Sequence, residues 1–233
     1  MPLEMEHRPS DSPYVARVWR CRSDDVAQMT SVATPRLGLA FWEQQGQVHV
    51  AVTGPESKAS PAPVPTYATF FGIDFALGTT LPHLPVAGLL DKQLEVPGAT
   101  RRTFQLAGSG WRVPDYDNAE TFVGRLVRED VLIRDPVVAE AARGATPSAS
   151  ERTVQRRFLA ATGLTPGAVR QIDRARRAAL LLQDGVPTAD LVNLLGYYDQ
   201  PHLARSLSRY IGRTTTRLRN GDPGEPLSLL YKT

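Results

Sequence analysis

Glycine, proline and capping residues divide the C-terminal third of this chain into helices of defined length. Ser150 is a helix-capping residue type, and the segment ERTVQRRFLAAT after it places Val154 and Phe158 four residues apart, on one helical face. The run GLTP at 163–166 ends that helix and begins another, which extends to about Gln183 and is therefore about 27 Å long. Its inner face is predicted to carry Val169, Ile172, Ala175 and Ala179.

A shorter pair of helices is predicted over residues 188–211. Thr188 is expected to cap a short helix through Leu195, Gly196 allows a tight turn, and Asp199 is expected to cap a final helix over 200–211. A short helix, a glycine turn and a helix with outward polar side chains are typical of the helix-turn-helix, whose second helix enters the major groove of DNA.

The charges of the chain are unevenly distributed. From Ser150 to Arg219 there are twelve arginines and five acidic residues, a net charge of +7, so the rest of the chain carries −4 of the overall +3. A basic module joined to a mildly acidic remainder fits binding of a polyanion such as DNA. Arginine-rich solvated helices are also common, and charge alone leaves that alternative open.

The first half of the chain is predicted to be mostly β. Residues 36–53 alternate as a hairpin with its turn at 44–47, residues 66–75 are rich in β-branched and aromatic residues, and 110–113 is a further strand. Residues 54–65 (GPESKASPAPVP) are predicted to be a loop, and 86–94 a short helix. Residues 1–14 are polar and proline-rich, which predicts a loosely ordered leader.

The pattern changes to helical near Pro114. A helix over 118–129 places Phe122, Val123, Leu126 and Val127 on one face, and Asp135-Pro136 opens another through Arg143. The predicted fold class is α+β, a β-rich N-terminal domain followed by an all-α double helix-turn-helix domain. The predicted divisions are a sensing or dimerisation domain over 1–117, a linker helix over 118–134, a DNA-binding domain over 135–222 and a tail over 223–233.

Two separated motifs in the C-terminal third resemble one known family. The sequences SERTVQRRFLAATGLTPGAVRQIDRARRA and GYYDQPHLARSLSRYIGRT are similar, in residues and in spacing, to the DNA-binding region of the AraC/XylS family of bacterial transcription regulators. The resemblance implies two helix-turn-helix units joined by a long helix, with recognition helices that enter successive major grooves. Two departures are a longer connection between Gly144 and Ser150, and Thr215 where the family usually has proline, which predicts a less sharp start of the terminal helix.

The resemblance also assigns DNA-contacting positions. The positions that read bases correspond here to Arg152, Gln155 and Arg156 in the first recognition helix and to Gln200, His202 and Arg205 in the second. Core positions fall on Val154, Phe158, Leu191, Leu195 and Leu203. Phosphate contacts are expected from Ser150, Thr153, Arg157, Arg174, Arg177, Arg209 and Arg213. For the stripe Arg170, Arg174 and Arg177, simple solvation is an equal alternative.

The N-terminal half is similar to the N-terminal domain of a subset of the same family, through VTGPESKASPAPVP, TYATFFGIDFALGTT and LPVAGLLDKQLEVP. This resemblance implies binding of a small effector or dimerisation. Aromatic and polar residues that could line an effector pocket are Phe41, Trp42, His49, Tyr67, Phe71 and Trp111. Aromatic residues on alternating strands are more often core, and that alternative stays the stronger one.

Other classes of protein find little support in the sequence. Cys21 lies between arginines, which could activate a thiol, but an incidental cysteine is the favoured reading; with one cysteine and scattered histidines no metal site is expected. No cofactor and no enzymatic activity are expected, and no apolar run predicts a membrane span or signal peptide, which favours a cytoplasmic protein. The expected partners are double-stranded DNA, a small-molecule effector, RNA polymerase if the protein is an activator, and a second copy of the chain. The rivals are a non-enzymatic interaction protein whose degenerate module binds another regulator, and an enzyme with a DNA-targeting module.

Overall fold

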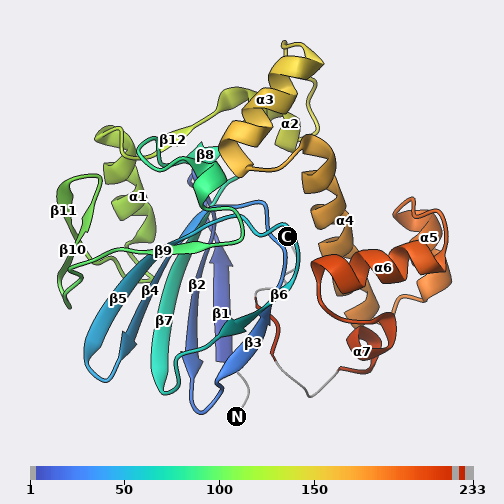
Figure 1. Cartoon of the computed structure of the whole chain (residues 1–233), viewed down its shortest axis with the longest axis horizontal. Helices are drawn as coiled ribbons and strands as arrows, with labels where there is room; N and C mark the ends of the chain where they lie inside the picture. Colours follow the sequence, from blue (N-terminus) through green and yellow to red (C-terminus); the bar gives the residue numbers. More distant parts are fainter. Residues whose placement is uncertain (1–3, 222–225, 229–233) are drawn as a thin grey trace. The chain divides into compact units, whose positions relative to one another are not determined.

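The computed structural model describes residues 4–221 and 226–228, and the chain forms two compact units (Figure 1). The first unit comprises Met1–Val26, Arg36–Pro55 and Pro65–Thr165. The second comprises two short stretches of the N-terminal half and the C-terminal part: Ala27–Pro35, Glu56–Val64 and Pro166–Thr233. The predicted α+β class is confirmed, because a β-rich N-terminal region is followed by a helical C-terminal region.

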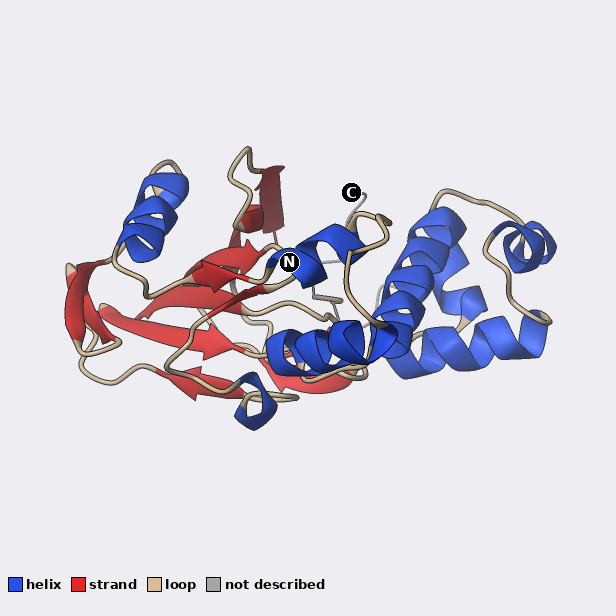
Figure 2. Ribbon diagram, turned by 90° about the horizontal axis from the view of Figure 1, so that it is seen from above, coloured by secondary structure: helices blue, strands red, loops and turns tan. Residues whose placement is uncertain are grey.

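An antiparallel sheet of six strands is the framework of the first unit (red in Figure 2). Its strand order is β1-β2-β7-β4-β5-β9. The strands are β1 (Glu4–Pro9), β2 (Val15–Ser23), β7 (Ala68–Phe75), β4 (Gly38–Gln44), β5 (Gln47–Thr53) and β9 (Gln93–Glu95). Because β7 lies between β2 and β4, the centre of the sheet is built from segments distant in sequence.

Strands β4 and β5 form the hairpin that the alternation over 36–53 predicts. Gln45 (φ 51°) and Gly46 (φ 79°) both adopt left-handed backbone conformations, as a two-residue turn that matches the twist of its strands requires. The register pairs Leu39 with Val52 and directs Leu39 and Phe41 to the same buried face. The hairpin prediction is therefore confirmed, as is the strand predicted over 66–75.

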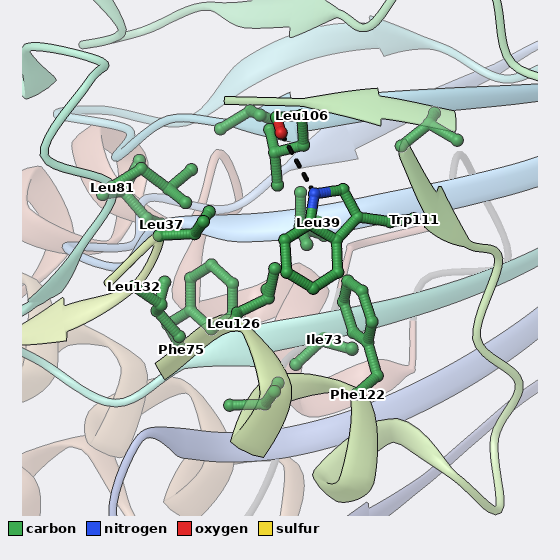
Figure 3. Close-up of a cluster of buried hydrophobic side chains, with 14 of the residues drawn as sticks. Leu37, Leu39, Ile73, Phe75, Leu81, Leu106, Trp111, Phe122, Leu126 and Leu132 are labelled. Atoms are coloured by element: carbon green, nitrogen blue, oxygen red, sulfur yellow. Dashed lines mark hydrogen bonds between the residues drawn. The ribbon is translucent and has the colours of Figure 1, made fainter. Parts of the chain in front are cut away.

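Helix α1 (Ala119–Arg128) and the hairpin of β10 (Thr103–Leu106) with β11 (Ser109–Arg112) supply side chains to the core on this face of the sheet (Figure 3). Phe122 and Leu126 from α1 are buried in that core, which confirms the helix predicted over 118–129. Trp111 is buried with them, and its Nε1–H donates to the Leu106 carbonyl at 3.0 Å. That bond satisfies the one polar group that the indole brings into the core.

The predicted loose leader is wrong for the described residues from Glu4 onward. Residues Glu4–Pro9 form β1 and pair with β2, and Arg8 fixes this edge strand to α1. Its guanidinium donates to Glu120 Oε1 and to the Tyr116 carbonyl, both at 2.6 Å. Hydrogen bonding from Arg8 lowers the pKa of Glu120 from 4.5 to about 2. A polar segment can thus be ordered by a few non-local bonds that no local pattern predicts.

The helix predicted over 86–94 is wrong for most of its length. Only η1 (Val86–Gly88) is helical, and the chain then turns through Asp91 (φ 56°) into β9. Strand β9 pairs with β5, so an available sheet edge prevails over a weak local helix preference. A further small pair in this unit joins β8 (Thr79–Thr80) to β12 (Ile133–Arg134).

The second unit contains the helices α4 (Pro166–Gln183), α5 (Thr188–Leu194), α6 (Gln200–Tyr210) and α7 (Thr215–Asn220). The prediction for α4 is confirmed, and its predicted inner face is buried. The unit also contains a two-stranded ribbon of β3 (Gln28–Ser31) and β6 (Ser60–Pro63), so the loop predicted over 54–65 is wrong where β6 lies. Pro61 and Pro63 lack the N–H of a ladder donor, and their low strand propensity concealed β6.

The ribbon and the residues flanking it cap the C-terminal end of α6. The last carbonyls of a helix have no partner within the helix. Here the Ala59 N–H donates to the Arg209 carbonyl at 2.8 Å, and the Ala33 N–H donates to the Tyr210 carbonyl at 2.9 Å. Arg213 is 8% exposed and donates to Thr30 Oγ1 at 2.8 Å. The N-terminal half of the sequence thus completes a C-terminal helix.

Candidate nucleic-acid interface

Two short helices of the first unit, α2 (Pro136–Ala142) and α3 (Glu151–Thr162), form the first candidate reading element. Asp135 caps α2 by accepting from the Val138 N–H at 3.1 Å, and its other oxygen accepts from Arg157 at 3.0 Å. Ser150 caps α3 by accepting from the Thr153 N–H at 3.3 Å. Both predicted helices are confirmed, as is the predicted cap by Ser150, and the Asp135 carboxylate connects the two helices.

The polar face of α3 is exposed as the sequence predicts. Arg152, Gln155 and Arg156 are exposed on successive turns, whereas Phe158 is buried and Val154 half-buried. Since Phe158 fixes the inner side, the three polar side chains point away from the core of this unit. This arrangement can present two guanidinium groups and one amide to a groove.

Helices α5 and α6 form the second candidate reading element, in the second unit. Gly196 (φ 67°) makes the turn between them, and Asp199 caps α6 by accepting from the His202 N–H at 2.6 Å. Leu203 and Leu207 fix the inner side of α6. The predicted cap by Asp199 is confirmed, but the one predicted for Thr188 is wrong, because Thr188 is already helical and no side chain caps α5.

The polar face of α6 begins in its first turn. Gln200 and Arg205 are exposed, and His202 is half-buried. The three predicted base-reading side chains therefore lie in the N-terminal half of α6, the part of a recognition helix that reaches base edges in helix-turn-helix proteins. Helix α3 belongs to the first unit and α6 to the second.

The side chains predicted to bind phosphate differ in how exposed they are. Arg177 and Arg209 are exposed, and Arg209 lies over the Tyr210 ring at 5.3 Å. Ser150 is exposed, Thr153 is half-buried, and Arg157 is half-exposed although it pairs with Asp135. Arg213 is buried against the ribbon, so it is not available to a phosphate in this structure.

The turn before α6 is held by a cluster around Tyr197. The Arg174 guanidinium lies 4.3 Å from the centre of the Tyr197 ring and donates to the Gly196 carbonyl at 3.1 Å. The hydroxyls of Tyr197 and Ser206 are 3.2 Å apart, and burial raises the pKa of Tyr197. Arg174, predicted to bind phosphate, therefore has a structural role in this turn.

The terminal helix begins sharply despite the absence of proline at position 215. Thr214 accepts a hydrogen bond from the Arg217 N–H at 3.3 Å and so caps α7. The predicted less sharp start is therefore wrong, because a capping threonine immediately precedes the helix.

The structure does not bring the six predicted effector-pocket residues together. Phe41, Phe71 and Trp111 are associated with the core of the first unit, where Phe41 and Phe71 stack at 5.4 Å. Trp42 follows Phe41 directly in β4 and so lies on the opposite face of the sheet, where it stacks on His49 at 5.0 Å. Tyr67 is 74% exposed, at a shallow hollow of about 220 Å³ whose other lining residues are Arg22, Glu43, Gln45, Gly46, Ala68 and Thr69.

Several exposed side chains in the second unit are additional candidates for contacts. Tyr198 is 90% exposed in the turn before α6, and Leu194 is 60% exposed at the end of α5. Arg217 and Arg219 are exposed on α7, and Arg170 lines a hollow of about 360 Å³ on α4 with Gly167, Gln171 and Arg174. The sequence pattern does not single out Tyr198 or Leu194, because an aromatic or leucine residue in such a motif ordinarily belongs to the core.

Other chemistry receives no support from the geometry. Cys21 is buried, and burial raises the pKa of its thiol to about 11, the opposite of an activated thiol. Within residues 4–221 and 226–228, no group of three or more metal-ligating side chains is found. In the same part of the chain, no helix combines the length and hydropathy needed to cross a membrane.

Comparison with known proteins agrees with this geometry. Residues 145–221 match a family model described as a helix-turn-helix domain. The matched region contains α3, the long helix α4 and the pair α5–α6. No curated protein and no solved structure matches the chain.

Proposed function

We propose that this chain is a DNA-binding regulator of the AraC/XylS type that controls transcription by binding specific sequences; the match of residues 145–221 to a helix-turn-helix family model supports this. The observation that carries the proposal is the pair of N-capped helices, α3 and α6, each with an exposed glutamine and arginine on its outer face. Glutamine can bind adenine and arginine can bind guanine through two hydrogen bonds, so such faces suit the reading of base edges.

The proposed roles follow from exposure and charge. Arg152, Gln155 and Arg156 on α3, and Gln200, His202 and Arg205 on α6, would read bases. Arg177 and Arg209, which are exposed, would bind phosphates, helped by Ser150, Thr153 and Arg157 at the start of α3. Arg213 is not among the proposed phosphate contacts, because its guanidinium already donates to Thr30 of the ribbon.

The N-terminal half is proposed to regulate this DNA binding, by binding a small effector or a second copy of the chain. The buried aromatic cluster of the first unit does not support an effector pocket at the predicted residues. RNA polymerase would be a partner if the protein is an activator.

Competition binding tests the proposed function directly. The full-length protein is mixed with fragments from its own genome, and the bound fragments are then challenged with random duplex at rising salt concentration. A specific regulator is expected to prefer its site over random DNA by a factor of about 10³ or more. If no fragment outcompetes random duplex, the proposal fails, and an interaction protein with a degenerate helix-turn-helix becomes the better explanation.

Arg205 and Arg209 provide a matched pair for separating base from phosphate contacts, because both are exposed on α6. Arg205→Ala is expected to weaken binding by about 1–3 kcal/mol and to relax the preference at one base pair. Arg209→Ala is expected to weaken binding equally on all sequences and to lower the salt dependence by about one ion. Measuring dissociation constants for each variant on specific and random duplexes distinguishes the two; a uniform loss for Arg205→Ala would assign Arg205 to phosphate instead.

A further inference from the structure

The imidazole of His202 is held by groups from the turn that precedes α6. The Tyr198 backbone N–H donates to His202 Nδ1 at 3.4 Å. The His202 ring meets the Tyr197 ring edge to face, with centroids 5.3 Å apart and an interplanar angle of 85°. The backbone of His202 is fixed as well, because its N–H donates to the Asp199 cap.

The Tyr198 bond determines the tautomer of the neutral ring. A backbone N–H can only donate, so Nδ1 must accept and carry no proton. The proton of the neutral imidazole is then on Nε2. In the part of the chain that the structure describes, Nε2 has no hydrogen-bond partner.

The Tyr197 ring that supports His202 is itself fixed. Its hydroxyl lies 3.2 Å from Ser206 Oγ, and Arg174 covers its face at 4.3 Å while bonding the Gly196 carbonyl. The position of His202 therefore depends on a cluster that extends from α4 to α6, and Tyr197 acts as a positioning residue.

From this arrangement we propose that His202 determines specificity as an obligate donor: its Nε2–H binds a hydrogen-bond acceptor on a base edge in the major groove. The acceptors available there are N7 of a purine, O6 of guanine and O4 of thymine, whereas cytosine presents only the N4 donor. At the base that His202 contacts, the protein therefore rejects cytosine. This inference rests on the proposed function, because it concerns how α6 reads DNA once DNA is bound.

Two substitutions distinguish the role of Nε2 from the role of Nδ1. In His202→Gln the side-chain amide NH₂ can take the place of Nε2–H. In His202→Asn the shorter side chain can accept from the Tyr198 N–H but does not reach the base. Both variants keep a polar residue in the first turn of α6, so both are expected to fold.

The first measurement uses the preferred site and its single-base-pair variants at every position. The wild type is expected to bind about tenfold to a hundredfold more weakly when cytosine stands at the contacted base. His202→Asn is expected to lose this preference, and His202→Gln to keep most of it. The inference is overturned if the contacted position prefers cytosine, or if both variants keep or both lose the preference. Failure of the proposed function is distinct, since the wild type itself would then show no preferred site.

The second measurement reports the tautomer without DNA. Nitrogen-15 NMR of the free full-length protein, with His202→Gln used to assign the signals, is expected to show a protonated Nε2 and an unprotonated Nδ1. A ring that carries its neutral proton on Nδ1 would overturn the inference whatever the binding data show.

Discussion

Replacing Phe41 by alanine is expected to lower the free energy of unfolding by about 3–5 kcal/mol. Phe41 is buried in the core of the first unit, where it stacks on Phe71 at 5.4 Å and meets Phe104 edge to face at 5.5 Å. Truncation removes the apolar area of the ring and leaves a cavity that these rigid neighbours cannot fill. Urea denaturation of the full-length protein, monitored by tryptophan fluorescence, measures the change.

Tyr67→Ala is the matched control, because Tyr67 is another aromatic residue of the predicted effector pocket but is largely exposed. Its substitution is expected to change stability by no more than about 0.5 kcal/mol. If Phe41→Ala were equally neutral and instead altered ligand-dependent behaviour, Phe41 would belong to a pocket rather than to the core.

Gly212→Ala is expected to destabilise the second unit by about 2–5 kcal/mol. Gly212 has a φ of 73°, and a left-handed conformation costs alanine about 1–2 kcal/mol. In addition, a Cβ at Gly212 would lie 2.7 Å from Thr30 Cγ2 and 3.2 Å from Ala59 Cβ, so the ribbon would have to move, at a cost of about 1–3 kcal/mol.

Gly185→Ala isolates the contribution of the ribbon. Gly185 follows α4 as Gly212 follows α6, and its φ is 84°, but a Cβ there would meet nothing within 4 Å. Gly185→Ala is therefore expected to lower stability only by the cost of the left-handed backbone conformation. The two variants are compared by measuring their thermal unfolding and their binding to the preferred DNA site. Equal losses of stability in the two variants would show that the ribbon can move at little cost. They would also show that capping of α6 by Ala33 and Ala59 contributes little to stability.

The connection through the ribbon is relevant to the regulation proposed for the N-terminal half. The chain passes between the two units at Val26–Ala27, Pro35–Arg36, Pro55–Glu56, Val64–Pro65 and Thr165–Pro166. Since Ala33 and Ala59 donate to the last carbonyls of α6, the N-terminal half is hydrogen-bonded directly to the second helix proposed to read DNA.

The sequence by itself determined the features that depend on neighbours within a few residues. Capping by Ser150 and Asp199, and the bounds of α4, follow from local hydrogen bonds and helical periodicity, and the structure has them as predicted. The β4–β5 hairpin follows in the same way from strict alternation around a two-residue turn. The family motifs predicted a helix-turn-helix region in the C-terminal third, and the match to a family model over residues 145–221 confirms it.

Only the tertiary structure decided the features that depend on partners distant in the chain. Strand β1 owes its order to β2 and to the Arg8–Glu120 pair, and the proline-containing β6 owes its pairing to β3. The same holds for Arg213. The sequence predicts that Arg213 binds phosphate, whereas in the structure its guanidinium donates to Thr30 Oγ1. Local propensity does not indicate which strand edge, carbonyl or hydroxyl will lie next to a segment after folding. For that reason the helices proposed to read DNA could be located from sequence, whereas the ribbon that completes one of them could not.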